Sequence, residues 1–311
     1  MLKAVCTSDV TNEPLYAIFK RLSALKTSGM RKGLIGTRDK ILAWAAKQNE
    51  KSGGFAVPDD KKANYSDHII QGKYHCLEIK RSEKRSGKAV LFVFGGGMIL
   101  DSGKASTGLS RKISKLAGAD VWLPFYPLCH KHDIVENTEM VYDCYRKMLA
   151  YYRPENIVFL GYSSGAALLI LDVITYINEL NDNSAGIPMP GLLIPVSPGS
   201  VPINEKERER MRKPDRKDVM LPTSYIDVAA EIMSCGHNVP RKYLATAHGD
   251  FRNAPMTHFY YGSSDVLYAF APICAETFRK AGADCVIYVG RGLHHCFAVT
   301  YYIPGVHKTV Q

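Results

Sequence analysis

The chain of 311 residues has no long uninterrupted apolar stretch. A helix that spans a bilayer needs about 20 consecutive, mainly apolar residues, and charged residues interrupt every apolar run before that length. The first residues, MLKAVCTSDVTNEP, also lack the apolar segment and small-residue cleavage site of a secretory signal. These absences predict a cytoplasmic protein without stable membrane insertion.

Paired cysteines and a stripe of one charge sign are also missing. The eight cysteines include no C-x-x-C pair, so a disulfide framework is not expected. The formal net charge is +10, but basic residues alternate with acidic ones, and the densest run, residues 205–218, has seven bases against five acids. This run is typical of a solvated mixed-charge helix or loop. We therefore expect no nucleic-acid partner.

Apolar strands alternate with helical segments through most of the chain. Hydrophobic residues make up 46% and charged residues 23%, as in ordinary folded proteins. The run AVLFVF at 89–94 is apolar at every position, which suits a strand covered by helices on both faces. Further strands are expected at 68–71, 74–80, 120–123, 156–160, 192–196, 258–261 and 285–289, and helices at 106–116, 137–151, 164–180 and 265–281. The alternation predicts an α/β fold with a mostly parallel central sheet flanked by helices.

Two regions depart from this alternation. Residues 15–48 have the apolar spacing of two helices separated by glycines. Residues 200–255 separate two strands by far more than one crossover helix requires. Long insertions that leave the carboxyl ends of strands commonly cover a site there, so we interpret this interval as a lid.

A candidate nucleophile lies between a predicted strand and a predicted helix. Gly161-Tyr162-Ser163-Ser164-Gly165 matches G-x-S-x-G, in which the serine occupies a sharp strand-to-helix turn. Flanking glycines leave room for the close approach of the two elements. The alternative is that Ser163 only caps the helix that follows it.

A glycine run after the strand at 89–94 supplies candidate donors for an oxyanion. Acyl transfer develops negative charge on the carbonyl oxygen, and backbone amides aimed at that oxygen stabilise it. Glycines allow this approach without obstruction by side chains. The amides of Gly96, Gly97 and Ser164 are therefore predicted to form an oxyanion hole.

Two alternative ligand sites fit the spacing poorly. A phosphate loop would have four residues between its glycines, whereas five separate Gly97 from Gly103, and Ala105 replaces the hydroxyl that would hold magnesium. A cysteine and two histidines in 129–132 suggest zinc, but no further ligands follow at a supporting spacing. We predict neither a metal nor a cofactor.

A base and an orienting carboxylate should follow the serine in the chain. Asp265 comes after the predicted strand THFYYG, and His294 and His295 come after DCVIYVG. Nucleophile, acid and histidine in this order are typical of α/β-hydrolases. Asp265 could alternatively serve only as the cap of the next helix. Either histidine could reach Ser163.

Together these segments resemble the hormone-sensitive-lipase group of microbial esterases within the α/β-hydrolases, over roughly residues 65–303. FGGGM is similar to that family's HGGG loop, GYSSGAAL to its G-D-S-A-G-G turn, VSPGS to its SPW segment and GSSDVL to its acid loop. GLHHCF is similar to the family's G-M-x-H-G-F loop, and this alignment implies that His295 is the catalytic histidine.

The resemblance implies a serine carboxylesterase with Ser163, Asp265 and His295 as its triad. It implies that residues 64–199 and 248–311 form the catalytic core, while residues 1–63 and 200–247 form a helical cap. The expected substrate is a small-molecule ester with a short acyl chain. Whether the chain forms a homodimer stays open. The alternatives are a deacetylase or amidase for a specific metabolite or sugar, and a binding protein without activity.

Three residues depart from the family pattern. Phe94 replaces the histidine that helps to hold the oxyanion loop, Tyr162 replaces the acidic residue before the serine, and Gly199 replaces the tryptophan after SP. None of these changes removes a catalytic group. They predict an altered substrate preference or loop geometry.

Overall fold

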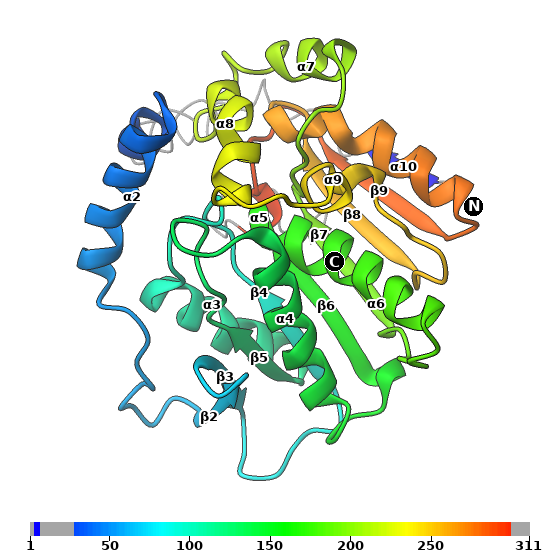
Figure 1. Ribbon diagram of the computed structural model, residues 1–311. Coiled ribbons are helices and arrows are strands. Elements are labelled where there is room, and N and C mark those ends of the chain that lie inside the picture. The colour runs from blue at the N-terminus through cyan, green and yellow to red at the C-terminus, as the bar shows by residue number, and fades with distance from the viewer. Residues whose placement is uncertain (1–2, 7–27, 300–311) are drawn as a thin grey trace.

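The computed structural model describes residues 3–6 and 28–299, without the side chains of residues 3–6, 169 and 170. Within these residues the centre is a nine-stranded sheet in the order β1-β9-β8-β7-β6-β4-β5-β3-β2 (Figure 1). The strands are β1 (Lys3–Cys6), β2 (Asn64–Ile70), β3 (Tyr74–Lys80), β4 (Ala89–Val93), β5 (Asp120–Pro124), β6 (Ile157–Tyr162), β7 (Leu192–Val196), β8 (Thr257–Gly262) and β9 (Cys285–Gly290).

The predicted mostly parallel α/β architecture is confirmed. All strand pairs from β1 to β5 along the sheet are parallel, while β3 is antiparallel to β5 and β2 to β3. β4 and β5 are buried at every residue, as expected for strands that helices cover on both faces. Parallel strands bring their carboxyl ends to one edge, where ligand sites of such sheets form.

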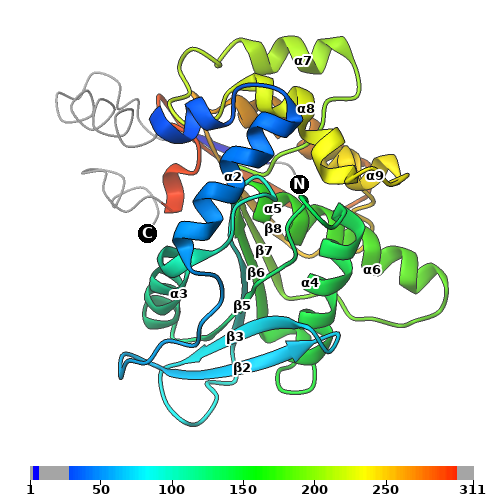
Figure 2. The same cartoon turned by 60° about the vertical axis from the view of Figure 1, so that its left-hand side comes forward.

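Helices cover both faces of the sheet. Figure 2 shows α3 on one side and α4 and α6 on the other. The helices are α2 (Arg38–Ser52), α3 (Gly103–Ala117), α4 (Ile134–Met148), α5 (Ser164–Ala166), α6 (Val173–Asp182), α7 (Glu205–Arg212), α8 (Thr223–Ser234), α9 (Arg241–Leu244) and α10 (Ala271–Lys280). The π-helical η2 (Ala167–Asp172) joins α5 to α6, and short 3₁₀ turns are η1 (Pro154–Asn156), η3 (Thr246–His248), η4 (Val266–Phe270) and η5 (Phe297–Val299). No described helix is long and apolar enough to cross a membrane.

The long interval between β7 and β8 contains α7, α8 and α9. Figures 1 and 2 show α7 and α8 above the end of the sheet where β6 turns into α5, with α2 beside them. Arg31, ahead of α2, donates from Nη1 to the carbonyl oxygens of Asp218 and Leu221 at 2.9 and 2.8 Å. These bonds connect the N-terminal segment to the insertion. The division into core and cap at the stated boundaries stays a prediction.

Several local predictions differ from the structure. The helix predicted at 164–180 is divided by the π-helical η2, and the one predicted at 265–281 begins as the 3₁₀ turn η4. Of the two N-terminal helices, the second is α2, and the first falls largely in residues 7–27, outside the described residues. β1 was not predicted, because four residues, KAVC, are too short to carry a strand period.

The predicted solvated character of the charge run 205–218 is wrong at two carboxylates. Glu207 is 5% exposed and Asp218 is 3% exposed. The Glu207 side chain accepts the amide of Ile203 at 2.9 Å, and Asp218 accepts backbone amides as described below. Buried carboxylates need such donors, and alternating charges along the sequence do not reveal which acid will find them.

Candidate active site

Ser163 occupies the sharp turn between β6 and α5. Its backbone has φ 55° and ψ −129°, a conformation that non-glycine residues rarely adopt. The Ser163 amide donates to the carbonyl of Val196 at 2.8 Å, and its carbonyl accepts the amides of Ala166 and Ala167. The turn is thus held from both sides, as strained backbone at a functional residue must be.

The glycines around Ser163 permit close contact between backbone segments. A Cβ at Gly165 would lie 2.2 Å from the carbonyl oxygen of Phe94, and one at Gly161 would lie 2.7 Å from that of Gly165. A Cβ at Gly95 would lie 2.7 Å from Cβ of Ser163. Only glycine fits at these positions, so the G-x-S-x-G pattern and the glycine run reflect one packing requirement.

His295 and Asp265 meet Ser163 at the carboxyl edge of the sheet. His295 Nε2 lies 2.9 Å from Ser163 Oγ, and His295 Nδ1 lies 3.0 Å from Asp265 Oδ1. The same Asp265 oxygen accepts the amide of Leu267 at 2.8 Å, so this carboxylate also caps η4. His294 points elsewhere, with Nδ1 2.7 Å from the His295 carbonyl oxygen. The structure therefore brings together Ser163, Asp265 and His295.

The surroundings of His295 favour its protonated form. Burial by itself lowers the pKa of the imidazole, but the Asp265 carboxylate and then Cys296 outweigh this effect. The pKa of His295 therefore lies well above its ordinary value. An imidazole stabilised in this way is a strong proton acceptor when it is neutral.

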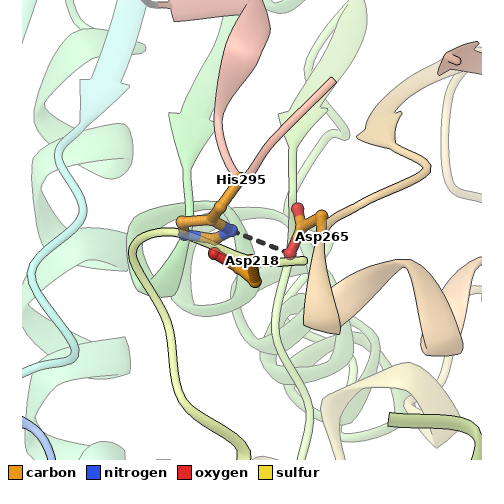
Figure 3. A group of neighbouring side chains, drawn as sticks. All are labelled: Asp218, Asp265 and His295. Carbon is orange, nitrogen blue, oxygen red and sulfur yellow. Dashed lines mark hydrogen bonds and ion pairs between the residues drawn. The ribbon is translucent and has the colours of Figure 1, made fainter. Parts of the chain in front are cut away.

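A second carboxylate, which sequence reasoning missed, lies beside this pair. Figure 3 shows Asp218, from the loop between α7 and α8, next to His295 and Asp265. One ligand atom from each of the three lies within 4.8 Å of the others. Asp218 Oδ2 accepts the amide of Val266 at 2.9 Å, and Oδ1 accepts those of two residues in its own loop. Burial and then the neighbouring Asp265 raise the pKa of Asp218, against the effect of His295.

This cluster has the residue types of a metal site, but all of its ligand atoms except Asp265 Oδ2 already take part in hydrogen bonds. Both oxygens of Asp218 accept amides, and one oxygen of Asp265 is shared between an amide and His295. We therefore interpret the cluster as a hydrogen-bond network. In the segment 129–132, where zinc was considered, the Cys129 sulfur accepts a hydrogen bond from the Asn137 amide.

The glycine loop contains two of the three amides that were predicted to form an oxyanion hole. Gly97 has the left-handed φ of 62°, and its carbonyl accepts the hydroxyl of Tyr225. The Gly96 amide, however, donates to Ser164 Oγ at 3.0 Å, as does the Met98 amide at 3.3 Å. Among the described residues, no acceptor is bonded to the amides of Gly97 and Ser164. In this conformation the Gly96 amide fixes the loop to the Ser164 side chain, and the oxyanion role of the Gly97 and Ser164 amides stays a prediction.

Phe94, which takes the place of the family's histidine, is buried and packs on a tyrosine. The rings of Phe94 and Tyr126 are stacked, with centroids 4.4 Å apart and planes at 16°. The Tyr126 hydroxyl donates to the Phe94 carbonyl oxygen at 3.1 Å. Ring stacking and the Ser164 hydroxyl thus hold this loop without the histidine.

A cavity of about 400 Å³ opens beside Ser163. Its wall includes Gly97 and His295 from the core and Tyr225 and Ile226 from α8, and most of the other lining side chains are apolar. Tyr162 and Gly199, two of the positions that depart from the family pattern, also line it. The volume lies within the range of small-molecule sites.

Comparison with known proteins agrees with this architecture. Residues 90–299 match a family model described as the alpha/beta hydrolase fold. The chain is 29% identical over 211 residues to an acetyl-hydrolase of Streptomyces hygroscopicus, covering 67% of this chain and 68% of that one. It is 25% identical over 219 residues to Esterase LipU of Mycobacterium tuberculosis, covering 68% and 71%.

A solved structure shares the whole fold. An esterase from the bacterial hormone-sensitive lipase family superposes with a TM-score of 0.74 at 19% identity, covering 93% of this chain and 94% of that one. The similarity in fold therefore extends well beyond the segment that the family model matches.

Proposed function

The chain belongs to the α/β-hydrolase fold family, and we propose that it hydrolyses carboxylic esters through a covalent acyl intermediate on Ser163. The observation that carries this proposal is the continuous series of contacts from Ser163 Oγ to His295 Nε2 and from His295 Nδ1 to Asp265 Oδ1, at 2.9 and 3.0 Å. A serine hydroxyl is a weak nucleophile unless an adjacent base removes its proton. The names of the two curated relatives, an acetyl-hydrolase and an esterase, agree with this reaction.

In the first half-reaction, His295 Nε2 accepts the Ser163 proton while Oγ attacks the acyl carbon. Asp265 fixes the imidazole tautomer and stabilises its positive charge. The amides of Gly97 and Ser164 hold the oxyanion of the tetrahedral intermediate, and each such donor contributes about 3 kcal/mol in enzymes where one has been removed. Return of the proton to the alcohol oxygen releases the alcohol and leaves the acyl-enzyme.

In the second half-reaction, water attacks the acyl-enzyme as His295 takes a proton from it. Collapse of the second tetrahedral intermediate releases the carboxylic acid, and the proton returns to Ser163 Oγ. Each turnover thus consumes one ester and one water and produces one acid and one alcohol.

The proposed substrates are small esters with short acyl groups. The cavity of about 400 Å³ accommodates a small ligand, and the apolar lining suits an alkyl or aryl group. Deacetylation of a specific metabolite or sugar, or amide cleavage, would use the same residues and is the second candidate, which the acetyl-hydrolase relative favours. The cytoplasmic location and the homodimer stay predictions from the sequence.

Substitution of the nucleophile tests the proposal. Ser163→Ala should abolish hydrolysis of p-nitrophenyl acetate and butyrate and should abolish labelling by a fluorophosphonate, which reacts with activated serines. Ser82→Ala, at an exposed serine far from the site in sequence, is the matched control and should keep both. A folded wild-type protein that neither labels nor turns over any ester would instead be a binding protein.

A further inference from the structure

Asp172 is a fully buried acid that borders the cavity beside Ser163. It ends η2, exposes none of its surface and is among the residues that line the cavity. Within the described part of the chain, neither of its carboxyl oxygens has a hydrogen-bond partner. Burial of an unpaired carboxyl group is costly, so a partner supplied by a ligand would offset a cost that folding leaves uncompensated.

The π-helical turn explains how this residue comes to border the cavity. In an α-helix, residues five apart point about 140° away from each other. A π-helix closes i→i+5 hydrogen bonds instead, as the amide of Val173 does here to the carbonyl of Leu168. Five-residue spacing therefore brings Ala167, beside the nucleophile, and Asp172 to the same side, and both line the cavity. Such turns are rare and occur frequently at functional sites.

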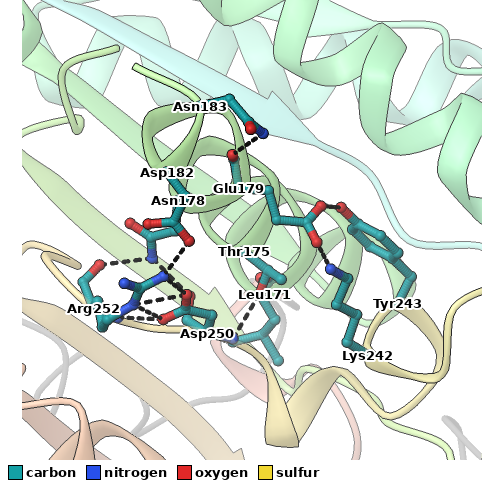
Figure 4. Close-up of polar contacts among 10 residues, drawn as sticks. All are labelled: Leu171, Thr175, Asn178, Glu179, Asp182, Asn183, Lys242, Tyr243, Asp250 and Arg252. Atoms are coloured by element: carbon teal, nitrogen blue, oxygen red, sulfur yellow. Dashed lines mark hydrogen bonds and ion pairs between the residues drawn. The ribbon is translucent and has the colours of Figure 1, made fainter. Parts of the chain in front are cut away.

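Polar side chains on the following turns of the helix are all bonded to other groups. Figure 4 shows Thr175, Asn178 and Glu179 with partners, and the same holds for Asp182, which accepts the Arg252 guanidinium. Thr175 Oγ1 donates to the Leu171 carbonyl and accepts the amide of Asp250. The Asn178 amide group donates to the carbonyls of Asp250 and Arg252.

Tyr243, which also lines the cavity, is held in the same way. Its hydroxyl donates to Glu179, so it does not supply the missing bond to Asp172 (Figure 4). Among the acids of this helical segment, Asp172 is therefore the one that borders the cavity and the one that lacks a partner in the described part of the chain.

The surroundings of Asp172 define the kind of group it would bind. Burial raises the pKa of this carboxyl well above its ordinary value and so favours the neutral acid, a form that both donates and accepts a hydrogen bond. Among the described residues no lysine or arginine lines the cavity, and its other acid, Asp101, accepts the Ser52 hydroxyl. Apart from His295 at the catalytic end, the described residues of the cavity offer an anionic group no counter-charge.

We propose that Asp172 is a specificity residue that binds an uncharged polar group, a hydroxyl or a primary amide, at the end of the substrate remote from the scissile ester. Asp172 follows Ser163 by nine residues, about two helical turns, which separates the recognised group from the reacting carbonyl by a chain of several carbons. Because Asp172 exposes none of its surface, contact with a ligand requires neighbouring side chains at this end of the cavity to move. The inference rests on the proposed ester hydrolysis.

Matched ester pairs test this inference. One series compares p-nitrophenyl esters of alkanoic acids, hexanoic to decanoic, with their ω-hydroxy counterparts. A second compares alkyl acetates with ω-hydroxyalkyl acetates, so that both the acyl side and the alcohol side of the ester are examined. In one of the two series, at one chain length, the wild type should prefer the hydroxylated ester by at least about tenfold in kcat/KM. The reason is that a plain alkyl ester would leave the buried carboxyl group without a hydrogen bond.

Two variants link the preference to the carboxyl group. Asp172→Leu should remove the preference, so that the ratio of kcat/KM between the hydroxylated and the plain ester of each pair falls to about one. Asp172→Asn, which keeps a neutral donor and acceptor, should retain part of the preference. Thermal unfolding checks that both variants are folded.

Several outcomes would overturn the inference. These are equal rates for both members of every pair, a preference that survives in Asp172→Leu, or a stronger preference for ω-amino esters, which would assign a cation to the site. Loss of all ester hydrolysis in the wild type, together with absent fluorophosphonate labelling, would overturn the proposed function itself and this inference with it.

Discussion

Two fully buried acids in this molecule have opposite surroundings. Glu78, on β3 near the far edge of the sheet, accepts hydrogen bonds from Arg85, from His68 and from Tyr152, at 2.9 to 3.1 Å. Asp172, beside the cavity, has no partner among the described residues. Burial by itself favours a higher pKa at both groups. At Glu78 the hydrogen bonds outweigh burial and lower the pKa to about 2, whereas at Asp172 burial acts alone and raises the pKa.

The difference separates a structural carboxylate from one that is open to a ligand. A buried carboxylate whose oxygens are all satisfied stabilises the fold in its charged form. A buried carboxyl without partners destabilises the fold and is retained where it serves another purpose. The acids at the carboxyl edge of the sheet, Asp265 and Asp218, lie between these two extremes, and substitutions of all four test the comparison.

The largest effect is expected for Asp265→Asn. Asp265 is bonded through Oδ1 to His295 and Leu267, while Oδ2 has no partner among the described residues. An asparagine there would favour the wrong imidazole tautomer, so kcat should fall by about 10³- to 10⁴-fold. Steady-state hydrolysis of p-nitrophenyl butyrate measures this loss, and an unchanged unfolding midpoint would show that the loss is not structural. A fall of less than tenfold would remove Asp265 from the proposed triad.

Glu78→Gln should have the largest effect on stability. A carboxyl with a pKa of about 2 in the fold and 4.5 in the unfolded chain stabilises the fold above pH 4.5, and this stabilisation is lost as the pH falls toward 2. The variant should therefore lose about 3 kcal/mol in free energy of unfolding at pH 7, and less near pH 4. Urea denaturation at both pH values measures this, with Glu83→Gln at an exposed glutamate as control. Equal losses at both pH values would contradict the role assigned to the charge.

Asp172→Leu should change stability in the opposite direction. The pKa of Asp172 is raised in the fold, so the wild type loses stability as the pH rises from its unfolded value of 3.8 toward the folded value. Removal of the unpaired carboxyl should therefore raise the free energy of unfolding by roughly 2 kcal/mol at neutral pH, and by less near pH 4. Asp59→Leu, at an exposed aspartate, controls for the added apolar surface. A destabilised variant would mean that Asp172 has a partner in the fold.

The predictable part of the site consists of residues that local sequence places. Ser163 lies in a short motif, and Asp265 and His295 each follow an apolar strand, so the parallel sheet brings them to one edge without further information. The strands and the sheet could be predicted for the same reason, because continuous apolar runs of this length are typical of buried strands.

The remaining residues depend on tertiary structure. Asp218 reaches the site from the insertion, and in the sequence it is one acid in a mixed-charge run. Asp172 lies in an apolar segment that predicts a continuous α-helix, on which it would point away from Ala167, and only the π-helical turn reverses this. The use of the Gly96 amide depends likewise on the side chain of Ser164, whose hydroxyl competes for it.

Asp218→Asn should have the smallest effect, which is a change in the pH dependence of kcat/KM. The groups that face His295 are Asp265, Asp218 and Cys296. Loss of the Asp218 charge, whose oxygen lies within 4.8 Å, should lower the pKa of His295, because a nearby anion stabilises the imidazolium. The acidic limb of kcat/KM, which rises as His295 becomes neutral, should therefore move to lower pH by about one unit.

Asp215→Asn is the matched control for this change. Asp215 belongs to the same loop and accepts the amide of Thr223 and the guanidinium of Arg31, so it shares the structural role without facing the imidazole. Its variant should leave the acidic limb in place even if KM changes. An acidic limb that stays fixed in Asp218→Asn, or moves to higher pH, would mean that Asp218 only holds the loop through Val266 and that Asp265 alone sets the charge at His295.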